Sequence, residues 1–212
     1  LEYFQDCVTF HSMAVGLGIR GDKQEDRAWY LIAWNIRIHR YPQMAENLTI
    51  VTEPYKMRGF YGYRRFRILD AQGTVLVEAD SNWIFMDTKK MIPVKIPQDL
   101  AERYISAPVK DQTVRVKRKL SADGVWTEGE KLTVTKIFLD SNGHVNNTYY
   151  VLWAEDVLPE CYEIGEVKVD YRQSAFLNDM IHISYIEEKD GWRVRFLNQD
   201  DTLIALVELK KR

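Results

Sequence analysis

The sequence predicts an α+β protein made of two tandem halves, each with a helix followed by strands of an antiparallel sheet. The same order of helical and strand-like segments occurs twice along the 212 residues. Two pairs of strand-like segments also match between the halves. Ile-Arg-Ile at 36–38 is followed by the segment 47–50, and Val-Lys-Val at 167–169 is followed at a similar distance by the segment 179–182. With 46% hydrophobic and 28% charged residues, the chain can bury a sizeable core.

The first half opens with a helix over Leu1–Leu17, in which apolar residues recur at near-helical spacing and Gly16 with Gly18 provides the stop. Four Val-, Ile- and aromatic-rich runs follow, with Gln72-Gly73 as a hairpin turn. We expect the strands at Ala28–Arg40, Asn47–Arg58, Gly59–Asp70 and Thr74–Met86.

The composition of the chain changes after the fourth strand-like run. Half of the six prolines of the chain lie within Thr88–Gln112, at Pro93, Pro97 and Pro108, where periodicity is weak. We therefore expect a first domain over residues 1–87, a connector over 88–112 and a second domain over 113–212.

The second half resumes with a basic strand from Thr113 and a further strand over Lys131–Leu139. A turn at Asn142-Gly143 then leads into a helix that starts at Val145 and ends at Pro159. Four more strands are expected, at Gly165–Ser174, Asp179–Glu188, Trp192–Leu197 and Thr202–Lys210. Only this half has a strand before its helix, so we expect the corresponding strand of the first half to be missing from the N-terminus.

One long helix wrapped by an antiparallel sheet is the hot-dog arrangement, and two in tandem form a double hot-dog. Such packing creates an apolar tunnel or groove between the two helices. Its large apolar side chains are expected to be mostly core, among them Phe10, Met13, Trp34, Phe60, Trp83, Phe85 and Trp153.

Three chemically capable side chains lie close together in the turn before the second helix. Asp140, Asn142 and His144 would place a carboxylate, an amide and an imidazole around one reacting carbonyl group. The first N–H groups of the helix would polarise that carbonyl group. An Asp-x-Asn-Gly stretch can also be only a turn held by Asx hydrogen bonds. The residue pattern alone leaves both interpretations open.

The stretch Asp140-Ser-Asn142-Gly-His144-Val-Asn-Asn-x-x-Tyr150 resembles the acyl-acyl-carrier-protein (acyl-ACP) thioesterases of plants and bacteria. Segments 3–6, 83–87 and 169–172 match the same family in the same order, so the resemblance covers nearly the whole chain. The His-Val-Asn-Asn core also occurs in single-hot-dog acyl-CoA thioesterases. The motif therefore indicates the superfamily, and the tandem architecture narrows it to the carrier-protein branch.

The resemblance implies cofactor-free hydrolysis of the thioester between a fatty acyl chain and a phosphopantetheine arm. Asn142 and His144 would hold the thioester and the attacking water, while Asp140 would orient them and stabilise charge. The family's further acid or cysteine is expected where this chain has Ser174 and Ala175, and a neutral serine cannot act as a carboxylate base.

The presence of Ser174 and Ala175 at these positions leaves three alternatives for the site. Asp140 with His144 activates water directly, which we favour; a nearby carboxylate such as Asp179 substitutes; or the site binds acyl groups and hydrolyses them poorly. Two rival functions remain, an acyl-CoA thioesterase and a catalytically weakened acyl-binding protein.

Charge and composition limit the partners. A net charge of −2 argues against a general nucleic-acid binder, and no apolar run reaches the roughly 20 residues of a membrane span. The two cysteines, Cys7 and Cys161, are not spaced like metal ligands, so neither a metal site nor a disulfide scaffold is expected. Such a low cysteine content is typical of proteins in the reducing cytoplasm, where we expect this protein to be located. We expect a monomer or homodimer that docks an acidic acyl carrier protein through basic side chains, namely Arg64, Arg65, Arg115, Lys117 and Lys119.

Overall fold

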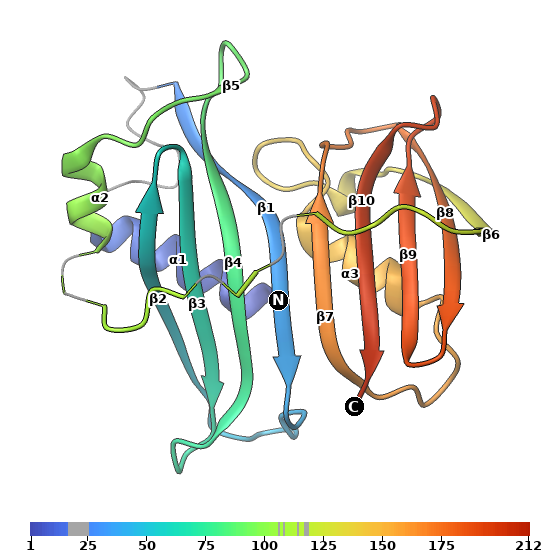
Figure 1. The fold of residues 1–212 in the computed structure, drawn as a ribbon, viewed down its shortest axis with the longest axis horizontal. Coiled ribbons are helices and arrows are strands. Elements are labelled where there is room, and N and C mark those ends of the chain that lie inside the picture. The colour runs from blue at the N-terminus through green and yellow to red at the C-terminus, as the bar shows by residue number, and fades with distance from the viewer. Residues whose placement is uncertain (17–25, 106, 108, 114, 117–118) are drawn as a thin grey trace. The chain divides into compact units, whose positions relative to one another are not determined.

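The computed structural model describes residues 1–16, 26–105, 107, 109–113, 115–116 and 119–212. The chain divides into two compact units, the first formed by Leu1–Ile32 with Ile36–Val116 and the second by Ala33–Asn35 with Lys117–Arg212. Each unit has a helix and a set of antiparallel strands (Figure 1). The α+β class and the tandem order are therefore confirmed.

The first unit contains all four expected strands. It consists of α1 (Glu2–Ala14), β1 (Arg27–Ile38), β2 (Thr49–Arg58), β3 (Tyr61–Leu69) and β4 (Val75–Asp87). The strand order is β2-β3-β4-β1, and the short strand β5 (Ile92–Pro93) pairs with β4.

Alternation along the strands explains how α1 is held. On β3 every second residue is buried, and the ring of Phe66 lies 4.8 Å from the ring of Phe4 on α1. Phe4 is the single buried residue of α1. Phe10 and Met13 are 68% and 50% exposed, so the expectation that they belong to the core is wrong.

The segment expected to be a connector contains a second helix, α2 (Gln98–Tyr104). Leu100 and Tyr104 on α2 form a buried cluster with Phe85 and Ile96. The sequence did not indicate this helix, because only two of its seven residues are buried, and a single pair at i, i+4 is too short to establish a helical period.

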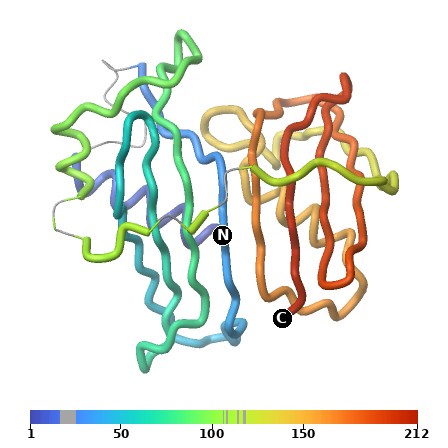
Figure 2. Tube along the Cα trace, viewed as in Figure 1, coloured from blue at the N-terminus to red at the C-terminus, as the bar shows by residue number. Residues whose placement is uncertain are grey.

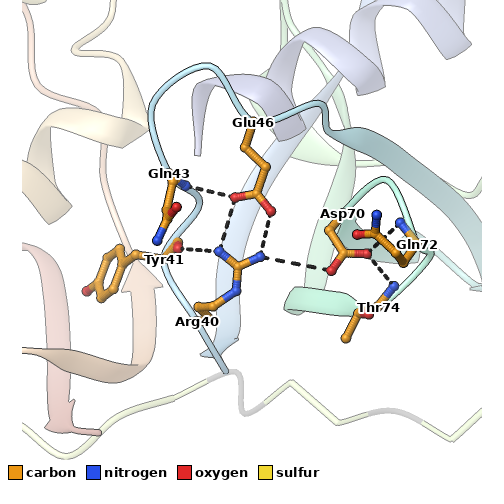
Figure 3. A network of polar contacts seen from close by, with 7 residues as sticks. All are labelled: Arg40, Tyr41, Gln43, Glu46, Asp70, Gln72 and Thr74. Atoms are coloured by element: carbon orange, nitrogen blue, oxygen red, sulfur yellow. Dashed lines mark hydrogen bonds and ion pairs between the residues drawn. The ribbon is translucent and has the colours of Figure 1, made fainter.

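A polar network joins the β1–β2 connection to the β3–β4 hairpin (Figure 3). The guanidinium group of Arg40 donates to both carboxylate oxygens of Glu46, at 3.0 and 2.6 Å, and lies 3.9 Å from Asp70. Asp70 in turn accepts the backbone N–H groups of Gln72 and Thr74. The bidentate bond to Arg40 is the main reason that the pKa of Glu46 falls to about 2.

The second unit follows the same plan (Figure 2). Its strand order is β7-β10-β9-β8-β6. The elements are β6 (Thr127–Thr133), the 3₁₀ helix η1 (Lys136–Phe138), α3 (Asn147–Glu155), β7 (Ile164–Tyr171), β8 (Met180–Glu188), β9 (Gly191–Leu197) and β10 (Leu203–Lys211). Tyr150 and Trp153 on α3 pack their rings against Phe196 of β9, at 5.4 and 6.2 Å.

Two of the strand predictions for this half of the chain are wrong. The strand over Lys131–Leu139 is replaced by β6, which ends at Thr133, and by η1. No strand lies among the described residues between 113 and 126, so the expected basic strand is absent from that part of the chain. There Leu120 is held by a side chain instead, because its backbone N–H donates to the carboxylate of Asp170 at 3.2 Å.

Candidate active site

The turn before α3 is closed by the carboxylate of Asp140. Its Oδ1 accepts the backbone N–H groups of Asn142 and His144, at 2.8 and 3.1 Å. The backbone N–H of Asp140 donates to the carbonyl oxygen of His144 at 2.7 Å, and Gly143 adopts φ +79°, where a side chain would be strained. The Asx hydrogen bonds expected of such a stretch are therefore present, and they fix the backbone positions of Asn142 and His144.

The three residues named by the sequence all lie in this turn. Asn142 is exposed, and its Nδ2 lies 3.4 Å from Oδ2 of Asp140. His144 is half-buried, and its ring meets the ring of Phe176 edge-on, with centroids 4.9 Å apart. The turn thus carries a carboxylate, an amide and an imidazole, of which the amide lies near the carboxylate and the imidazole packs against Phe176.

The loop after β7 lies directly beside this turn. His144 and Phe176 form an antiparallel bridge, and the backbone N–H of Val145 donates to the carbonyl oxygen of Ala175 at 2.9 Å. Ala175 is buried and Ser174 is exposed. The positions where the family's further acid or cysteine is expected therefore adjoin His144, but they carry a methyl group and a hydroxyl group.

A carboxylate does lie on the same loop. Oδ2 of Asp179 accepts the backbone N–H of Phe176 at 2.8 Å, and the carbonyl oxygen of Asp179 accepts the N–H of Val134. Asp179 thus shapes the loop that holds Phe176 against His144.

The start of α3 differs from the expected one. The helix begins at Asn147, because Oδ1 of Asn146 accepts the backbone N–H of Thr148 at 3.1 Å and its hydroxyl at 3.0 Å. The first N–H groups expected to polarise a carbonyl are therefore partly used by this cap. The buried phenol of Tyr171 donates to the carbonyl oxygen of Asn147 at 2.7 Å and ties β7 to the helix start.

Burial raises the pKa of Tyr150 and of Tyr171, so both phenols stay protonated at neutral pH. The two hydroxyl groups differ in their partners. Tyr171 donates to the Asn147 carbonyl, whereas the buried hydroxyl of Tyr150 makes no well-formed hydrogen bond to a described residue, and the backbone of Ala175 acts against the effect of burial on its pKa. Sequence reasoning missed Phe176 and the role of Tyr171, because both contacts join segments far apart in sequence.

The residues expected to dock a carrier do not share one environment. Arg64 is buried and faces α1, so it does not lie on the surface. Arg65 is mostly buried and lies 3.8 Å from Asp80 and 3.6 Å from Asp111. Two other residues are exposed, Arg115, which pairs with Asp111, and Lys119, while Lys117 lies outside the described residues.

Neither a metal centre nor a membrane span is seen in the described ranges. No group of three or more His, Cys, Asp or Glu residues there could hold a metal ion. No helix in the same ranges is both long enough and apolar enough to cross a bilayer.

Two tandem units, each with a helix against an antiparallel sheet, define a double hot-dog protein. The family model of the acyl-ACP thioesterase N-terminal domain matches residues 1–104, and that of the C-terminal domain matches residues 126–205. The chain belongs to the acyl-ACP thioesterase family.

Curated relatives agree with this assignment. A chloroplastic acyl-acyl-carrier-protein hydrolase from Cuphea viscosissima is 27% identical over 192 residues, which cover 82% of this chain and 46% of that protein. The chain thus spans about half the length of the curated relatives it matches.

Solved structures share the fold over the full chain. An acyl-ACP thioesterase from Bacteroides thetaiotaomicron superimposes with a TM-score of 0.86 at 18% identity, covering 100% of this chain and 87% of that one. The 12:0-ACP thioesterase from Umbellularia californica gives a TM-score of 0.80 at 21% identity, with the same two coverages.

Proposed function

We propose that this chain hydrolyses the thioester between a fatty acyl group and the phosphopantetheine arm of an acyl carrier protein, and releases the free acid. Family membership supports this reaction class. The observation that carries the proposal is the single turn in which Asp140 fixes Asn142 and His144 beside the loop of Phe176.

Asn142 and His144 are the groups that would contact the reacting thioester. The exposed amide of Asn142 can donate to a carbonyl oxygen as negative charge develops on it. The imidazole of His144 can hold the attacking water. The water oxygen forms the new bond to the carbonyl carbon, the carbon–sulfur bond breaks, and the thiol leaves with one proton.

Asp140 is the base that we favour, acting with His144. Its Oδ1 is used by the two backbone N–H groups, and the second oxygen lies toward the amide of Asn142. That second oxygen is the one available to orient or deprotonate water. Asp179 is the alternative base, since it lies on the loop that contacts His144.

A second candidate function is acyl binding with little hydrolysis. The observation that favours it is the absence of an acid or thiol at Ser174 and Ala175, although both adjoin the His144 turn. A protein of this kind would bind acyl groups saturably and release no acid.

Docking of an acidic carrier would use exposed basic side chains. Arg115 and Lys119 remain candidates, whereas the burial of Arg64 removes it from such a surface. Binding through exposed charges should weaken as salt rises, and affinity that does not change with salt would contradict this docking mode.

The test is thiol release from one acyl group presented on carrier protein and on CoA. The proposal predicts a higher kcat/KM on the carrier, and substitution of His144 by Ala should remove turnover. A higher kcat/KM on CoA would favour an acyl-CoA thioesterase. Saturable binding of both substrates without thiol release would favour the acyl-binding function.

A further inference from the structure

We propose that the first unit contains a binding site for the carboxylate of an aliphatic acid, centred on Arg64 beneath α1. Arg64 lies on β3 and is only 5% exposed. A buried guanidinium group is costly unless an opposite charge compensates it. The surroundings of Arg64 therefore indicate whether the protein itself provides that charge.

The partners of Arg64 among the described residues are all uncharged. Its Nη1 donates to Oγ1 of Thr52 at 2.8 Å, and its Nη2 lies 3.2 Å from Nδ1 of His11. Its Cζ stands 5.7 Å from the centre of the Tyr104 ring. Within the described residues no carboxylate forms an ion pair with Arg64. These contacts satisfy some of the donors and leave the charge unmatched.

The neighbouring residue on the strand shows the contrast. Arg65 points to the opposite face of β3 and has Asp80 and Asp111 within 4 Å. The sheet thus carries two adjacent arginines, and within the described ranges only Arg65 has carboxylate partners.

Arg64 keeps its charge despite burial. Desolvation lowers its pKa to about 10, while the nearby phenol of Tyr104 and thiol of Cys7 act in the opposite direction, so the guanidinium is protonated at neutral pH. Burial first and Arg64 second lower the pKa of His11. Because a guanidinium can only donate, Nδ1 of His11 accepts and the imidazole is neutral.

The chemistry around Arg64 favours a carboxylate with an aliphatic tail. The planar fork of a guanidinium matches the two oxygens of a carboxylate. The hydroxyls of Ser12 and Tyr104 form a hydrogen bond to each other at 3.1 Å, which leaves one O–H of the pair to donate to the same anion. Phe66, two residues along the same face, packs with Phe4 and gives the surroundings an apolar wall.

Access under α1 would break the contacts of His11 with Arg64 and Tyr104 and the hydrogen bond between Ser12 and Tyr104, but few apolar contacts. Phe4 is the one buried residue of this helix, so a small shift of its second half breaks few apolar contacts. An incoming carboxylate would take the place of His11 at Nη2 of Arg64. This site does not depend on the proposed hydrolysis, although the acid released by that reaction would be a ligand of the same class.

Titration of the full chain with dodecanoate, and with dodecanol as the uncharged match, tests the proposal. Dodecanoate should bind, and Arg64→Met should weaken binding about tenfold or more. Arg67→Met is the matched control, because it removes an equal charge from an exposed position on the same strand and should leave binding unchanged. Equal binding by wild type and Arg64→Met would overturn the site.

A second measurement covers the case in which Arg64→Met does not fold. In wild type, dodecanoate should raise the pKa of His11 measured by NMR, since the bound anion offsets the field of Arg64, and dodecanol should not. An unchanged pKa of His11 at saturating dodecanoate would contradict the proposal. Because neither measurement uses a thioester, both can succeed even if hydrolysis fails, and His144→Ala should leave both results unchanged.

Discussion

The carboxylate of Asp140 accepts the backbone N–H of His144 at 3.1 Å, so the residue that carries the imidazole is positioned by the acid four positions earlier. The same Oδ1 also holds the N–H of Asn142. Asp140 therefore has a structural role in the turn that can be separated from any role of its negative charge in catalysis.

Asp140→Asn should separate these roles. The amide oxygen can still accept both N–H groups, so the free energy of unfolding should change by less than about 1 kcal/mol. Loss of the charge should lower kcat by about 100-fold or more. Urea unfolding and thiol release measure the two effects.

Asp140→Ala is the companion variant. It removes the acceptor as well as the charge, so we expect a further loss of about 1–2 kcal/mol of stability. Near-normal turnover in Asp140→Asn would rule out Asp140 as the base and would favour Asp179 as the base instead.

The two buried phenols should respond differently to loss of their hydroxyl groups. Tyr171→Phe leaves the carbonyl of Asn147 without its donor and should cost about 1 kcal/mol. Tyr150→Phe removes a hydroxyl that makes no well-formed hydrogen bond to a described residue and only approaches the backbone of Ala175, so stability should stay within about 0.5 kcal/mol. Equal destabilisation of the two variants in urea would show that Tyr150 has a partner.

Asp170 should be important for stability. This buried carboxylate accepts the backbone N–H of Leu120 at 3.2 Å and Nε of Arg172 at 3.0 Å. Asp170→Asn should cost about 2–3 kcal/mol, because it leaves the guanidinium without its counter-charge. Urea unfolding should show much less loss for Glu166→Gln, whose pair with Lys168 is only partly buried. Comparable losses would contradict the account of Asp170.

Stability should depend on pH through His11. Its pKa in the folded chain lies below the ordinary 6.5, so the unfolded chain takes up a proton first as pH falls. The contribution of neutral His11 is therefore fully present above about 6.5 and is lost as pH falls below that value. Urea midpoints between pH 7.5 and 5 should fall less steeply for His11→Gln than for wild type. Parallel slopes would contradict this prediction.

The pattern of apolar residues along the sequence was sufficient to predict most of the strands. Buried and less buried residues alternate along β3 and along β9 from Arg193 to Leu197, and this period can be read directly from sequence. The run from Leu132 to Leu139 has the composition of a strand. Val134 still continues the pairing of β6 with β8 through its hydrogen bond to Asp179. The strand is lost after that residue, because the chain turns into η1 and leaves Ile137 exposed.

The candidate site was predictable where its residues are neighbours in sequence. Asp140, Asn142 and His144 lie in one short turn, so the motif alone places them together. Phe176 could not be predicted, because its contact with His144 depends on where the loop after β7 ends. The burial of Arg64 was also missed, since an alternating strand does not reveal which of its faces a helix covers.

The central claim is hydrolysis of a carrier-bound acyl thioester at the His144 turn. Its most direct test is single-turnover thiol release from dodecanoyl carrier protein, with wild type and His144→Ala compared at equal enzyme concentration. We expect stoichiometric release of thiol and dodecanoic acid by wild type and no release above background by the variant. Equal release by both proteins, or none by wild type that has bound the substrate, would contradict it.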